Sequence, residues 1–132
     1  MQERIVITGM GTVNPLGLNV SESWGNATAG VSGVGPITWF DSTPLQVHIA
    51  AEVKGFSPEN YMDAKEVRRR DRFEQLTIAS AKQALEQSGL VVTEANAGRI
   101  GVIISSAIGG LHALQEAVLT NHIEGPRRVS PF

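Results

Sequence analysis

The pattern of apolar positions predicts two buried strands. Residues 4–8 (RIVIT) and 99–104 (RIGVII) are short runs rich in β-branched side chains, and glycine directly follows the first run. Such runs are typical of strands that are covered on both faces. A weaker strand-like stretch lies at 47–53, within a segment where glycine and proline recur.

Helices are predicted between and after these strands. The first covers about residues 22–29, with Asn19 or Ser21 as its cap and Gly30 at its end. The last covers about residues 111–122 and closes near glycine and proline.

A longer helical region is predicted from residue 63 to 88, with Gly89 as its C-terminal cap. Its second half, 73–85, is apolar on nearly all sides, so we expect it to be buried between layers. The order strand, helices, strand, helix predicts an α/β fold with a parallel sheet. Two strands make an incomplete core, and the final RRVSPF has no terminal character, so we expect a truncated domain.

Composition narrows the class of protein. The 132 residues are 42% hydrophobic and 18% charged, as in an ordinary globular domain. The formal net charge of −2 gives no reason to expect a nucleic acid as partner. No run approaches the roughly 20 apolar residues of a membrane helix, and the charged start lacks a secretory signal. A cytoplasmic protein is therefore expected.

Residue types also limit the chemistry. The chain contains no cysteine, which excludes a disulfide, a thiolate metal site and a cysteine nucleophile within these residues. No two of the histidines His48, His112 and His122 have the spacing of a helical metal pair, and no carboxylate completes a zinc-like cluster. We therefore predict no metal site and no catalytic histidine.

The loop after the first predicted strand contains Gly9-x-Gly11. A dinucleotide-binding turn would need a third glycine where Asn14 stands, and Pro15 opposes a helix that starts there. A structural tight turn is the favoured interpretation.

Residues 105–110 (SSAIGG) follow the second predicted strand. Ligands of open α/β sheets bind outside such strand ends, so this loop is predicted to form a substrate wall, with a plain glycine turn as the alternative. A nucleophile at Ser105 or Ser106 would need a partnering base, and no G-x-S-x-G elbow is present.

The main charge feature is a basic cluster within the long predicted helix, formed by Lys65, Arg68, Arg69, Arg70 and Arg72. In a continuous helix, four of them would share one face: Lys65, Arg68, Arg69 and Arg72. The charge pattern leaves open a solvated face or a dock for an acidic partner or phosphate, with a second patch at Arg127 and Arg128.

Five stretches, taken in order, resemble the β-ketoacyl-[acyl-carrier-protein] synthases, and most of all the elongating type II enzymes. They are RIVITGMGTVNPLG, GVSGVGPITWFD, AKEVRRRDRFEQ, RIGVIISSAIGGL and GPRRVSPF, and they span essentially the whole chain. The resemblance implies that residues 1–132 are a partial N-terminal ketosynthase domain.

The family has a thiolase-like α/β fold, in which two related halves form a five-layer αβαβα core, and its members are homodimers. The implied activity is acyl transfer: fatty acid elongation by decarboxylative Claisen condensation of an acyl thioester with malonyl-acyl carrier protein. A cysteine at a helix N-terminus and two histidines carry the chemistry. All three are expected beyond Phe132, so we expect this chain to be inactive alone. No cofactor is implied, because acyl carrier protein supplies the phosphopantetheine arm.

The resemblance also assigns residues by position. A basic surface for acyl carrier protein corresponds to Lys65, Arg68, Arg69, Arg127 and Arg128. Because acyl carrier protein is strongly acidic, the resemblance favours a dock over a solvated face.

Two positions correspond to the acyl pocket. Ile108 matches a residue that gates the pocket, and Phe132 neighbours a gating phenylalanine. Family members usually have GSGIGG where this chain has SSAIGG, so Ser105 and Ala107 would strain the loop if the replaced glycines had positive φ.

Two other functions stay open. A non-catalytic, ketosynthase-like chain-length subunit of a polyketide-type heterodimer would share this N-terminal region but lack the cysteine. A stand-alone carrier-binding module would require the chain to be folded and monomeric.

Overall fold

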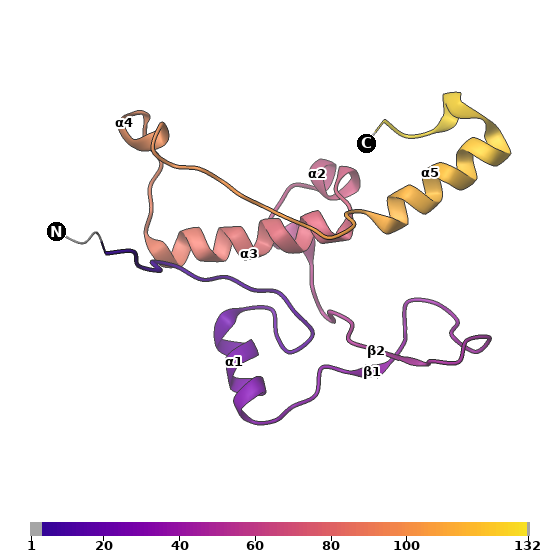
Figure 1. Ribbon diagram of the computed structural model, residues 1–132, viewed down its shortest axis with the longest axis horizontal. Coiled ribbons are helices and arrows are strands. Elements are labelled where there is room, and N and C mark those ends of the chain that lie inside the picture. The colour runs from indigo at the N-terminus through magenta and orange to yellow at the C-terminus, as the bar shows by residue number, and fades with distance from the viewer. Residues whose placement is uncertain (1–3, 132) are drawn as a thin grey trace. The chain divides into compact units, whose positions relative to one another are not determined.

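Helices carry most of the regular structure in the computed structural model, which describes residues 4–131 (Figure 1). The α-helices are α1 (Val20–Thr28), α2 (Ala64–Arg69), α3 (Arg72–Ser88), α4 (Glu94–Ala97) and α5 (Leu111–Glu124). Single 3₁₀ turns are η1 (Pro58–Asn60) and η2 (Pro126–Arg128). The chain divides into two compact units, one formed by the chain up to Ser57 with Ala79–Leu90, the other by Pro58–Ile78 with the chain from Val91 onward.

In the first unit, the loop after residue 8 is held against α3. A Cβ added at Gly9 would collide with the backbone oxygen of Ala84, and one at Gly11 would collide with that of Ser80. Glycine is required at both positions because the loop and the helix backbone touch. The tight structural role predicted for this turn is therefore confirmed, and it comes from packing on a helix.

Glutamine side chains of α3 fix the same loop. The backbone N–H of Met10 donates to Gln87 Oε1 at 2.6 Å, and that of Thr12 donates to Gln83 Oε1 at 3.2 Å. Gln83 Nε2 in turn donates to the carbonyl of Leu18 at 2.7 Å. These bonds satisfy backbone groups that have no strand partner.

The predicted helix caps are present. Asn19 accepts from the backbone N–H of Glu22 at 2.9 Å and starts α1, while Gly30 adopts φ 71° just after its end. Gly89, with φ 65°, follows α3 in the same way. Both glycines occupy the left-handed conformation that ends many helices.

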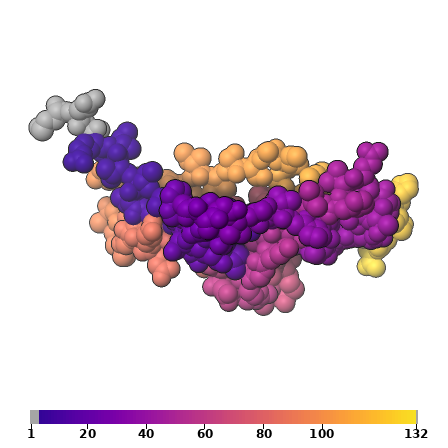
Figure 2. Space-filling view, turned by 90° about the horizontal axis from the view of Figure 1, so that it is seen from below, coloured from indigo at the N-terminus to yellow at the C-terminus, as the bar shows by residue number. Residues whose placement is uncertain are grey.

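The only ladder among the described residues is a short antiparallel one, in which β1 (Gly35–Pro36) pairs with β2 (Ile49–Ala50). Figure 2 shows this part of the first unit, in purple and magenta, on the surface. Beyond the paired residues, Glu52 after β2 accepts from Thr38 after β1, from its Oγ1 at 2.7 Å and from its backbone N–H at 2.9 Å. The strand-like stretch at 47–53 thus contains a strand, but an antiparallel one.

Two sequence expectations about the core are wrong for the described chain. Residues 4–8 and 99–104 pair with no other described segment, and Ile5 and Ile103 are 99% and 97% exposed. A strand needs a neighbour for its backbone groups, and the described chain supplies none. Within 73–85, Ala79 alone is fully buried and Leu85 is 47% exposed, because burial on all sides requires a layer on each side of the helix.

None of the helices in the described range has the length and apolar character that crossing a bilayer requires.

Candidate functional site

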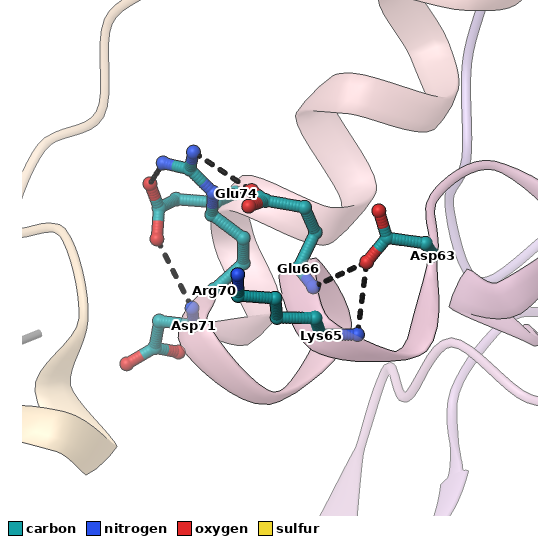
Figure 3. A network of polar contacts seen from close by, with 6 residues as sticks. All are labelled: Asp63, Lys65, Glu66, Arg70, Asp71 and Glu74. Carbon is teal, nitrogen blue, oxygen red and sulfur yellow. Dashed lines mark hydrogen bonds and ion pairs between the residues drawn. The ribbon is translucent and has the colours of Figure 1, made fainter.

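The candidate site lies in the second unit and begins with α2. Asp63 caps this helix, since its Oδ1 accepts from the N–H groups of Lys65 and Glu66, both at 2.9 Å (Figure 3). The cap fixes the start of a six-residue helix whose basic side chains at positions i, i+3 and i+4 are Lys65, Arg68 and Arg69. All three residues are exposed, and we call them the basic helix face.

The predicted helical region is broken between α2 and α3. Arg70 has φ −105° and ψ 129°, an extended conformation that ends α2. Gln75 compensates for the break, because its Nε2 donates to the carbonyls of Val67 and Arg70, both at 3.0 Å. The break moves Arg72 out of the predicted face and into α3, where it is half-buried and burial lowers the pKa of its guanidinium.

Arg70 is engaged by the protein's own acids. Its Nη2 lies 2.9 Å from Glu66 Oε2 and its Nη1 lies 3.2 Å from Glu74 Oε1 (Figure 3). Hydrogen bonds to Glu66, and then to Glu74, raise the pKa of Arg70. A shallow hollow of about 260 Å³ beside this network is lined by two acids and two bases, Glu66, Arg69, Arg70 and Glu74. Arg70 is therefore tied to two acids of the same region, next to the exposed residues of the basic helix face.

The second predicted basic patch follows α5. Gly125, with φ 89°, ends the helix, and Arg127 and Arg128 lie in η2. Arg128 Nε lies 3.4 Å from Glu124 Oε2, with both side chains largely exposed. The 14 residues of α5 span about 21 Å, and the helix starts beside Asp71 at the end of α2. The basic helix face thus precedes a residue that contacts the start of α5, whereas Arg127 and Arg128 follow the end of α5.

The loop at 105–110 joins the run 99–104 to α5. Ser106 Oγ accepts from the N–H of Gly109 at 3.1 Å, and Gly109 has φ 80°. Ser105 and Ala107 do not have positive φ, since no described residue other than glycine does. Their side chains therefore add no backbone strain. Ile108 is 70% exposed, and Phe132 lies outside the described residues.

Asp71 is a site residue that the sequence interpretation missed. Its Oδ1 accepts from the backbone N–H of Arg72 at 2.5 Å, and its Oδ2 accepts from the N–H of Ala113, in the first turn of α5, at 3.2 Å. The pattern Asp71-x-x-Glu74 is a helix-start signature, and the N–H of Asp71 donates to Glu74 Oε2 at 3.1 Å. This signature lies inside the helical region predicted at 63–88, and it is the local sign that a second helix begins there.

Two of the histidines, His112 and His122, lie on α5. His112 Nε2 lies 4.0 Å from Glu116 Oε1, and both side chains are exposed. Within residues 4–131, no three residues among His, Asp and Glu are arranged to hold a metal ion.

Comparison with known proteins identifies the family to which the chain belongs. The model of the family described as "Beta-ketoacyl synthase, N-terminal domain" matches residues 2–132. The chain belongs to the β-ketoacyl synthase family.

Relatives within the β-ketoacyl synthases agree closely in sequence. The chain is 46% identical over 130 residues to 3-oxoacyl-[acyl-carrier-protein] synthase 2 of Staphylococcus aureus (strain COL). This alignment covers 98% of the present chain and 31% of that protein. It is 48% identical over 134 residues to the protein of the same name from Coxiella burnetii (strain RSA 493 / Nine Mile phase I). That alignment covers 99% of the present chain and 32% of the relative. The chain thus spans about a third of the length of these curated relatives.

Solved ketosynthases share the fold. The ishigamide ketosynthase/chain length factor aligns with a TM-score of 0.76 at 26% identity, over 96% of this chain and 32% of that one. A chain of the AntDE:AntF complex, a type II PKS acyl-carrier protein with its ketosynthase bound to the hexaketide, aligns with a TM-score of 0.77 at 22% identity over 98% and 33%. The predicted thiolase-like α/β fold class and the resemblance to an elongating ketosynthase are confirmed.

Proposed function

We propose that the complete protein containing this chain elongates fatty acids by decarboxylative Claisen condensation of an acyl thioester with malonyl-acyl carrier protein. Residues 1–132 would be its partial N-terminal ketosynthase domain and would supply a carrier-docking surface and part of the acyl-pocket wall. The observation that carries the proposal is the 46–48% identity to two proteins named 3-oxoacyl-[acyl-carrier-protein] synthase 2, over nearly the whole chain.

The basic helix face supports the docking role. Its three cations are exposed at the protein surface. An acidic carrier protein would be attracted to this face before contact and oriented by it on docking. Arg127 and Arg128, beyond the far end of α5, would contact a second region of the carrier.

The acyl-pocket role rests on the loop at 105–110. Ile108 would narrow the pocket, because a β-branched side chain limits how deeply an acyl chain can reach. Phe132 would stand next to a second gating residue. Ser105 and Ala107 have ordinary backbone conformations, so their side chains add no strain to this loop.

The condensation itself needs groups that residues 1–132 do not contain. The chain has no cysteine, so the nucleophile and the two histidines that assist decarboxylation would come from the rest of the complete protein. The cysteine would take the acyl group from its thioester, and the carbanion left by loss of CO₂ from malonyl would then attack that acyl carbon. The product would remain on the carrier's phosphopantetheine thiol, so no other cofactor is needed.

A chain-length subunit without catalytic activity is the second candidate. The likeness to a ketosynthase/chain length factor at 26% identity favours it, but the identity to the 3-oxoacyl synthases is higher. We therefore place the condensing enzyme first.

The decisive experiment uses the complete protein. It is incubated with acyl-acyl carrier protein alone, and the acyl-enzyme is sought by mass spectrometry; malonyl-acyl carrier protein is then added and CO₂ release is measured. A condensing enzyme forms the adduct on a cysteine and releases CO₂ in proportion to the 3-oxoacyl product. A protein that forms neither the adduct nor the product, but activates a separate ketosynthase, would be the chain-length subunit.

A further inference from the structure

The start of α5 has an unusual cap. Gly110 occupies the N-cap position but has no side chain, so it cannot accept from the free N–H groups of the first turn. The N–H of Leu111 donates to the carbonyl of Gly109 at 3.2 Å, and that of Leu114 donates to the carbonyl of Gly110 at 3.0 Å. The N–H of Ala113, at the third helical position, is the group that an N-cap side chain would normally bind.

Asp71 supplies the missing acceptor from 42 residues away. Its Oδ2 accepts from the Ala113 N–H at 3.2 Å, so a carboxylate from the start of α3 takes the place of an N-cap side chain. The negative charge also lies at the positive end of the α5 dipole. Asp71 thus caps α5 in trans.

Gly110 and Asp71 are matched to each other. A Cβ at Gly110 would overlap Asp71 Oδ2 and lie 2.9 Å from Asp71 Cγ, so the carboxylate occupies the space that a side chain at 110 would need. The φ of Gly110 is −83°, which any residue can adopt, so glycine is required here for space alone. A second contact lies one residue earlier, where a Cβ at Gly109 would meet the ring of Phe73 at 3.9 Å.

We propose that Asp71 is a positioning residue that sets the acyl-chain-length preference of the enzyme by anchoring the loop at 105–110 to the start of α3. This inference rests on the proposed function, since it deepens the pocket role given to Ile108. The hydrogen bond is made to Ala113 in the first turn of α5, and the carboxylate packs against Gly110, the last residue of the loop. Loss of the cap frees that end, so the loop and the side chain at 108 vary in position and reject long acyl chains less sharply.

The test compares four forms of the complete protein: wild type, Asp71→Ala, the double variant Asp71→Ala with Gly110→Ser, and Asp63→Ala. The double variant replaces the cap in trans by a serine cap in cis, and the new Cβ lies 3.2 Å from Cβ of residue 71, which requires a shift of a few tenths of an ångström. Asp63→Ala removes the cap of α2 without touching α5, so it is the matched control.

Two measurements are made on each form. Hydrogen exchange reports opening of residues 111–114. The ratio of kcat/KM for a short and a long acyl N-acetylcysteamine thioester, each condensed with malonyl-N-acetylcysteamine, reports chain-length preference without a carrier. Asp71→Ala should raise exchange about fivefold, the usual effect of losing a cap, and should change the ratio by about threefold or more. The double variant should return both values to within about twofold of wild type, and Asp63→Ala should change neither.

Other outcomes overturn the proposal. Unchanged exchange at 111–114 in Asp71→Ala would show that the carboxylate does not cap α5. Faster exchange with an unchanged ratio would make Asp71 a structural cap without a positioning role, as would an equal loss of activity with both thioesters. If Asp71→Ala does not fold, Asp71→Asn, which keeps an acceptor oxygen, is compared with Asp71→Leu by the same two measurements. A wild-type protein that elongates neither a short nor a long acyl group, even when both are presented on acyl carrier protein, would refute the proposed function and the role in selectivity together, while the exchange data would still decide the cap.

Discussion

Arg70 and Glu66 form an ion pair with Nη2 2.9 Å from Oε2, one turn apart at the end of α2. Glu74 approaches the same guanidinium from α3 at 3.2 Å, so two carboxylates share one cation. The five basic residues of this region therefore have different surroundings. Arg70 joins two helices, Arg72 is half-buried, and the basic helix face of Lys65, Arg68 and Arg69 remains outward.

Charge reversal at Arg68 and Arg69 should weaken binding of acyl carrier protein to the complete protein. Replacing both by glutamate turns attraction into repulsion, so we expect Kd to rise about tenfold to a hundredfold at low salt. The difference from wild type should shrink as salt is added, because the Debye length is only about 8 Å at physiological ionic strength. Fluorescence titration with labelled carrier protein at several salt concentrations measures the effect.

The matched control for this reversal is Arg70→Ala. It removes a cation next to the same face, but one already held by two carboxylates, so it should change Kd less than about threefold and lower stability slightly instead. A small acyl thioester should be turned over equally by the double reversal and wild type. If the double reversal and wild type bind the carrier with equal affinity at low salt, the basic helix face is a solvated surface and not a docking site.

Gly11→Ala should destabilise the first unit. The added Cβ would overlap the carbonyl oxygen of Ser80 and lie 2.8 Å from Cβ of Gln83, so the loop must move off α3. Overpacking of this kind costs about 1–3 kcal/mol. The thermal midpoint of the complete protein and exchange at Met10 and Thr12 would both report it. Gly25→Ala is the control, since its added Cβ inside α1 would have no atom within 4 Å apart from its chain neighbours and the nearby backbone of its own helix. Alanine there should be neutral or stabilising.

The contact between Glu52 and Thr38 should depend on pH. Hydrogen bonds from the Thr38 side chain, and then from its backbone N–H, lower the pKa of Glu52 below its ordinary value of 4.5. Because the folded pKa is the lower one, the stabilisation is fully present above 4.5 and is lost as the pH falls through the folded pKa. NMR titration should show the Thr38 amide and the Glu52 carboxyl shifting together below 4.5, and Glu52→Gln should abolish this titration at Thr38. A Thr38 amide that titrates at or above 4.5 would contradict the contact.

Residues 1–132 alone should not accept an acyl group. They contain no cysteine, and Ser106 Oγ in the loop at 105–110 accepts a hydrogen bond from the N–H of Gly109. After incubation with acyl-acyl carrier protein, intact-mass spectrometry should therefore show an unmodified chain, with the complete protein as positive control. A stable acyl adduct on the 132-residue chain would refute the need for a nucleophile elsewhere.

Sequence patterns predicted the features that depend on near neighbours. The cap by Asn19, the helix ends at Gly30 and Gly89, and the closing of α5 at Gly125 are all present. Each involves a hydrogen bond or a backbone conformation within about one helical turn, so the residues that decide it stand together in the sequence. The family itself could be recognised because the five stretches keep their order along the chain.

Contacts between distant residues were decided only in the tertiary structure. Asp71 is turned toward Ala113, 42 residues further along the chain, and no local pattern reveals this contact. Gly9 and Gly11 are glycines because α3 lies against them, and the runs at 4–8 and 99–104 remain unpaired because their backbone groups meet no other described strand. Helix caps are local hydrogen bonds that a sequence carries within itself, whereas packing and strand pairing require a partner that only folding brings near.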